Sequence, residues 1–135
     1  ALSGGLSTWK KEVFETVSFD TKNKFHAYED KEFSIRIERA FPKQMFIVPQ
    51  AKLYHYHAAG NRQSLLRRTQ NDVVEVMKLF KKNGNYNWLG FDLIVLLLGL
   101  LINALVLSLT HLNINFLINY LRGFNQGRKS QILPE

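Results

Sequence analysis

Few side chains in this sequence have a type and spacing that could do chemistry. His55 and His57 are one residue apart, so on a strand both imidazoles would lie on one face, a spacing that metals can use. Two ligands are too few for a zinc site, and no cysteine is present to add more. The neighbouring tyrosines favour an interface over a metal site. His111 follows a long apolar segment, where haem ligation, proton relay and plain solvation at lipid headgroups all remain open.

Nothing else in the sequence has the pattern of a catalytic or cofactor site. We find no glycine-rich phosphate loop, no nucleophile with a matching base and no pair of acidic residues at a catalytic spacing. The sequence therefore predicts a protein that is not an enzyme, with no cofactor, no metal and no small-molecule substrate.

The basic residues indicate a membrane surface better than a nucleic acid. The net charge is +7, from 18 Lys and Arg against 11 Asp and Glu. A nucleic-acid interface would need a clustered basic stripe with aromatic residues between the charges, and none is present. The densest basic pairs lie within one helix length of the apolar segment. We predict that they contact anionic phospholipid headgroups: Arg67, Arg68, Lys81 and Lys82.

The segment from Phe91 to Leu112 determines the class of the protein. Between Leu93 and Leu109 it carries no charge and only two polar side chains. A helix of about 20 residues is roughly 30 Å long, which is the thickness of a bilayer's hydrocarbon core. A buried core helix is the alternative, but this chain is too short to surround one. We predict a single transmembrane helix over residues 91–112, near the C-terminus. Residues expected to anchor it at the membrane surfaces are Tyr86, Trp88, Tyr120 and Arg122.

Small and polar residues on this helix fall on one stripe. At 100° per residue they project within about 80° of one another. The stripe consists of Asp92, Gly99, Asn103, Thr110 and Asn113. Such stripes are how membrane helices pack together, and Leu100 and Leu101 would then face lipid. Because a single helix has nothing of its own to pack on, we expect the partner helix to belong to another chain.

The region before the span, residues 1–87, is predicted to mix short helices with extended segments and to lack a large independent core. An amphipathic helix is expected at about 9–19 and a longer one at about 63–82. Alternating apolar and charged residues favour extended segments over about 33–57, with a two-turn helix as the alternative for 33–39. Residues 113–135 are predicted to continue the span as a helix that Gly123 and Gly127 end, followed by a tail. The predicted class is a mostly α membrane protein.

This plan resembles the small single-span accessory subunits of mitochondrial inner-membrane complexes, namely the respiratory complexes and ATP synthase. The resemblance covers architecture alone and assigns no residue a role. It implies a non-catalytic structural subunit that supports assembly and has other subunits as partners. A membrane-anchored adaptor whose N-terminal region recognises a partner is the alternative. More basic residues precede the span than follow it, which places its N-terminal side in the matrix.

Overall fold

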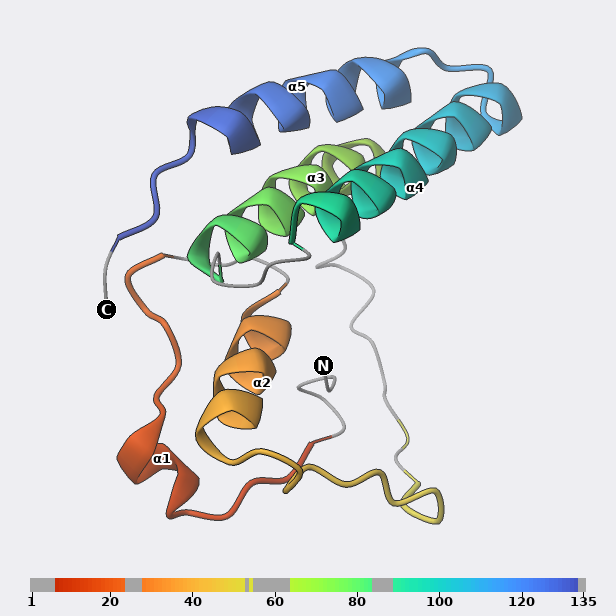
Figure 1. The fold of residues 1–135 in the computed structure, drawn as a ribbon. Helices are drawn as coiled ribbons and strands as arrows, with labels where there is room; N and C mark the ends of the chain where they lie inside the picture. Colours follow the sequence, from red (N-terminus) through yellow and green to blue (C-terminus); the bar gives the residue numbers. More distant parts are fainter. Residues whose placement is uncertain (1–6, 24–27, 53, 55–63, 84–88, 134–135) are drawn as a thin grey trace. The chain divides into compact units, whose positions relative to one another are not determined.

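The computed structural model describes residues 7–23, 28–52, 54, 64–83 and 89–133. This part of the chain contains five α-helices and no strand, so the prediction of a mostly α protein is confirmed. The chain forms two compact units, residues 1–61 and 62–134. Figure 1 labels the helices, which are α1 (Val13–Thr16), α2 (Glu29–Ala40), α3 (Leu65–Lys82), α4 (Leu89–Thr110) and α5 (Asn115–Lys129).

Helix α2 replaces the extended segment expected over residues 33–39. Phe33 and Ile37, four residues apart, are both buried, whereas Ile35 is only half-buried. The apolar residues that alternate along this segment therefore belong to a helix, and Phe33 and Ile37 lie on its buried face. Glu32 adds a second link at the same spacing, because its carboxylate accepts two hydrogen bonds from Arg36, at 2.6 and 2.9 Å. The strand prediction is wrong here, and its helical alternative is correct.

The first unit has a small aromatic core. Val17, Phe33 and Ile37 are its buried residues. Phe19 stacks on Phe33 with ring centroids 4.1 Å apart, and Trp9 meets the same ring edge-on at 5.5 Å. This core explains why α1 is a single turn instead of the predicted helix over 9–19. Val17 adopts an extended backbone, which ends the helix and brings Phe19 onto Phe33.

The rest of the predicted extended region is described only in part. Residues 44–48, between Pro42 and Pro49, form neither a helix nor a strand. His55 and His57 lie outside the described residues, so the structure does not test their role.

Helix α3 begins and ends close to the predicted residues. The Ser64 hydroxyl accepts a hydrogen bond from the Arg67 amide and so caps the first turn. At the other end the Asn83 side-chain amide donates to the Leu79 carbonyl at 2.7 Å. Its buried face includes Val73 and Met77.

Helix α4 runs over Leu89–Thr110, within two residues of the predicted span. Within it, Gly90–Thr110 is long and apolar enough to cross a membrane, and no other helix among the described residues is. The span is followed by α5, so it is not the last element of the chain.

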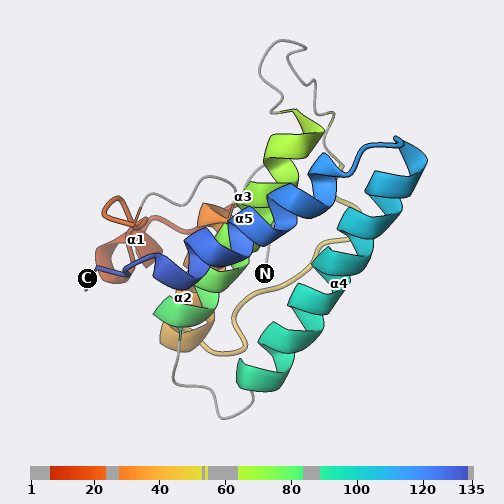
Figure 2. The ribbon, with the colours of Figure 1, turned by 90° about the horizontal axis from the view of Figure 1, so that it is seen from above.

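The chain reverses after α4 instead of continuing the helix as predicted. Leu112 takes a left-handed backbone with φ of 47°, and the Asn113 amide donates to the Ser108 carbonyl at 2.9 Å, the closing bond of a helix C-terminal turn. The Asn113 side chain then accepts from the Asn115 amide as α5 begins. The reversal returns α5 along the preceding helices, and Figures 1 and 2 show α3, α4 and α5 side by side.

Candidate functional site

One face of α4 is packed against the chain's own helices. Val73, Met77, Ala104 and Tyr120 form the buried cluster of the second unit. The α4 leucines that pack against this cluster are Leu93, Leu97, Leu100 and Leu101. The expectations that Leu100 and Leu101 face lipid, and that α4 has nothing of its own to pack on, are therefore wrong. They failed because the return of α5 was not predicted.

Two glycines let α5 approach α3 closely. A Cβ atom added at Gly123 would lie 2.5 Å from the Gln70 carbonyl oxygen, and one at Gly127 would lie 2.7 Å from the Met77 sulfur. Both glycines are buried inside α5, so they do not end the helix as predicted. Their spacing of four residues is the Gly-x-x-x-Gly pattern of close helix contacts, a signal that was present in the sequence.

Side-chain hydrogen bonds connect the three helices at two places, one at Tyr120 and one at Lys81. The Tyr120 hydroxyl donates to the Leu97 carbonyl at 3.1 Å, and burial raises the pKa of Tyr120. The Lys81 amine donates to the carbonyls of Gly127, Arg128 and Ser130 at 2.7 to 2.8 Å. Lys81 thus caps the C-terminal end of α5, where the carbonyls lack helical partners. Tyr120, predicted as an anchor at the membrane surface, is buried inside the bundle.

The predicted stripe lies off the packed face of α4. Asp92, Gly99, Asn103 and Thr110 are exposed, and a Cβ added at Gly99 would meet nothing within 4 Å. The Thr110 hydroxyl is satisfied by the Val106 carbonyl of its own helix, at 2.9 Å. The fifth residue of the stripe, Asn113, lies in the turn before α5. The chain itself therefore provides no partner for the stripe among its described residues.

A broad apolar surface of α4 is also uncovered. The larger exposed fractions there are 74% at Leu109, 65% at Phe91 and 61% at Ile102. Exposed apolar residues of the same helix continue this surface: Ile94, Val95, Leu96, Leu98, Leu105 and Val106. A surface of this size on a soluble monomer would be unusual, and it fits lipid or a protein partner.

Contacts between the helices show at which level of α4 each charged residue of α3 and α5 lies. Helix α5 runs antiparallel to α4 (Figure 2). Lys129 lies nine residues after Tyr120, and Leu89 lies eight residues before its contact Leu97. Because the two helices are antiparallel, both of these offsets point toward the start of α4. At about 1.5 Å per residue, each offset is roughly 12–14 Å long. Lys129 is therefore level with the start of α4, and so is Lys78, since its neighbour Met77 contacts Gly127.

The first turn of α3, in contrast, lies beside the middle of α4. The Asn119 side chain, adjacent to Tyr120, donates to the Leu66 carbonyl at 3.0 Å. Arg67 and Arg68 follow directly, and the Arg68 side chain is 70% exposed and pairs with Asp72 at 3.6 Å. The two predicted headgroup contacts at this end of α3 are thus beside the middle of α4, whereas Lys81 and Lys82 are level with its start.

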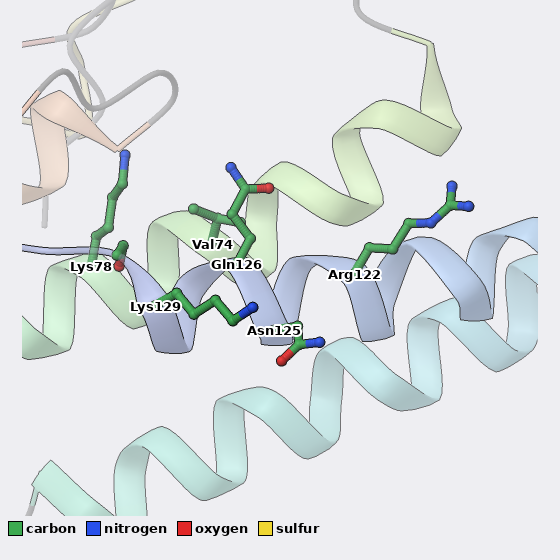
Figure 3. A pocket seen from close by; sticks show the side chains of 7 residues that line it. Val74, Lys78, Arg122, Asn125, Gln126 and Lys129 are labelled. Atoms are coloured by element: carbon green, nitrogen blue, oxygen red, sulfur yellow. The ribbon is translucent and has the colours of Figure 1, made fainter.

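An open groove of about 580 Å³ lies between α3 and α5. Figure 3 shows most of its lining side chains, with Val74 and Lys78 projecting from α3 and the others from α5. The residues from the α5 side are Arg122, Asn125, Gln126, Lys129 and Ser130. Three cations lie in this lining, and none of the described lining residues is acidic. Arg122, predicted as a surface anchor, belongs to this groove.

Other predicted positions carry no site in the described part of the chain. His111 is exposed at the end of α4, with its ring 5.4 Å from that of Phe116. Tyr86 and Trp88, the expected anchors before the span, lie outside the described residues. Among the residues that the structure describes, no three His, Asp or Glu side chains come together as metal ligands would. No family model, no curated protein and no solved structure matches the chain.

Proposed function

We propose that this chain is a non-catalytic structural subunit of a multi-subunit membrane complex, with α4 crossing the membrane. The observation that carries the proposal is the position of charged α3 residues beside the middle of α4. A charged side chain in the hydrocarbon core costs at least about 2.5–3.5 kcal/mol. If α4 spans the bilayer, the exposed Arg68 cannot face lipid at that level. Other protein, or water enclosed by it, must cover this side of α3, which favours an assembly over a lone anchor.

The two uncovered surfaces of α4 have different roles in this proposal. The broad apolar surface around Ile102 and Leu109 faces lipid acyl chains. The stripe with Gly99 and Asn103 faces a helix of another subunit, because an exposed glycine permits close backbone approach and an asparagine can donate across the contact. The chain thus contributes packing and stability to the complex, and no chemistry.

The proposed location is the mitochondrial inner membrane, in a respiratory complex or ATP synthase. The architectural resemblance described above supports it. We orient the start of α4 toward the matrix, because the reversal at Leu112 gathers basic residues at that end. These residues are Lys78, Lys81, Lys82, Arg128 and Lys129.

Native sizing of detergent-extracted protein tests the assembly. The chain is expected in a particle far larger than its own 15.7 kDa. Gly99→Leu should lower its recovery in that particle, because the added side chain separates the two helices. Gly90→Leu is the matched control: a Cβ at Gly90 also meets nothing within 4 Å, but Gly90 is not on the stripe. Extraction of the wild-type chain alone, under conditions that keep other complexes intact, would contradict the proposal and favour the anchored adaptor.

A further inference from the structure

We infer that the groove between α3 and α5 binds the phosphate of an anionic phospholipid headgroup. The inference rests on the proposed membrane location and adds a specific ligand site to it. The site is distinct from the stripe of α4, and it differs from the basic pairs that the sequence indicated.

The lining of the groove has the chemistry of a phosphate site. Lys78 and Lys129 supply ammonium donors, and such charge-assisted hydrogen bonds to phosphate are stronger than neutral ones. Asn125 and Gln126 add amide donors. Glu75 lies 3.4 Å from the Lys78 amine and offsets part of that charge. Two further cations remain in the lining, so the groove keeps a net positive charge.

The groove lies at the level where a headgroup would be. Lys78 and Lys129 are level with the start of α4, which is one end of the apolar span. Arg122 is seven residues before Lys129, about 10 Å further along α4 and close to the level of Arg68, so it lies below the headgroups and does not reach the phosphate. A basic pocket between helices on the matrix or cytoplasmic side is a setting in which anionic headgroups bind.

The surface beside the groove favours a lipid over free phosphate. Leu121 and Phe124 are 57% and 39% exposed on the adjacent face of α5. A ligand with both a phosphate and acyl chains would contact the basic groove and these apolar side chains together. Free phosphate would use the first surface only.

The walls of the groove are held by contacts that do not need the ligand. The Lys81 amine bridges α3 to the C-terminal carbonyls of α5. The Ser130 hydroxyl donates to the Gly127 carbonyl at 2.7 Å. Lys81, one of the predicted headgroup contacts, is therefore used to hold the helices together.

The test is lipid binding by the full-length chain, purified in a nonionic detergent and measured by native mass spectrometry. Phosphatidylglycerol is titrated against phosphatidylcholine, and inorganic phosphate is added as a competitor. We expect retained phosphatidylglycerol, little phosphatidylcholine, and no displacement by millimolar phosphate. Because one basic residue near an anionic surface contributes about 1 kcal/mol, Lys129→Gln should weaken binding by about fivefold.

Arg128→Gln is the matched control, because it removes one exposed cation next to Lys129 that does not line the groove. It should leave lipid binding unchanged, and Lys129→Arg should retain it. Circular dichroism establishes that each variant keeps its helical content. An equal loss with Arg128→Gln, no loss with Lys129→Gln, or displacement by phosphate would overturn the inference. The measurement uses the isolated chain, so its failure is distinguishable from failure of the assembly test.

Discussion

Replacing Gly123 with alanine adds one methyl group at the closest approach of α5 to α3. The added Cβ would lie 2.5 Å from the Gln70 carbonyl oxygen and 3.1 Å from the Val73 Cβ. Both neighbours belong to a packed helix, so α5 must shift away. Overpacking of this kind costs about 1–3 kcal/mol, and the better helix propensity of alanine returns about 1 kcal/mol. We expect a net loss of up to about 2 kcal/mol in the free energy of unfolding.

The assay is unfolding of the full-length chain in mixed micelles with increasing denaturing detergent, followed by circular dichroism. Gly99→Ala is the control, because it adds the same methyl group where nothing lies within 4 Å. It should be neutral or more stable by up to about 1 kcal/mol. If Gly123→Ala is as stable as Gly99→Ala, α5 does not pack on α3 in the way the structure shows.

Three further substitutions test other contacts of the second unit by the same unfolding assay. Tyr120→Phe removes the hydroxyl bond to Leu97 and should cost about 0.5–1.5 kcal/mol, whereas Tyr54→Phe, at an 85% exposed residue, should change nothing. Leu100→Ala should destabilise by about 1–3 kcal/mol, because Leu100 packs on the buried cluster. Leu98→Ala, at a 52% exposed position, should be near neutral. Equal effects of the two substitutions would contradict the packing of Leu100 on the cluster. Leu112→Gly should stabilise by about 1 kcal/mol, since glycine adopts a φ of 47° without the steric cost to leucine, and a loss of stability would show that the Leu112 side chain has a contact of its own.

The sequence predicted the long elements well because their signals are local. The apolar run of α4 and the capped amphipathic stripe of α3 each specify a helix without help from the rest of the chain. The short element α2 was missed because alternation at Phe33, Ile35 and Ile37 fits a strand as well as a helix over so few residues. The pair Glu32 and Arg36, spaced by four, was the signal that distinguished them.

The reversal after α4 could not be read in the same way. It depends on Leu112 in a left-handed conformation, which leucine seldom adopts and glycine usually provides. Without the reversal, Gly123 and Gly127 looked like helix ends, and Leu100 and Leu101 looked like lipid contacts. The basic groove could not be predicted from the sequence for the same reason, since Lys78 and Lys129 come together only when α5 returns to α3.

The central claim, that α4 crosses the membrane, can be tested directly because the chain has no cysteine. Single cysteines at Gln131 and at Leu112, which is 93% exposed, would report on the two ends of α4. In sealed inner-membrane preparations, a membrane-impermeant maleimide should label Gln131→Cys only from the matrix side and Leu112→Cys only from the opposite side. Labelling of both variants from one and the same side would contradict the claim, because α4 would then lie on the membrane without crossing it.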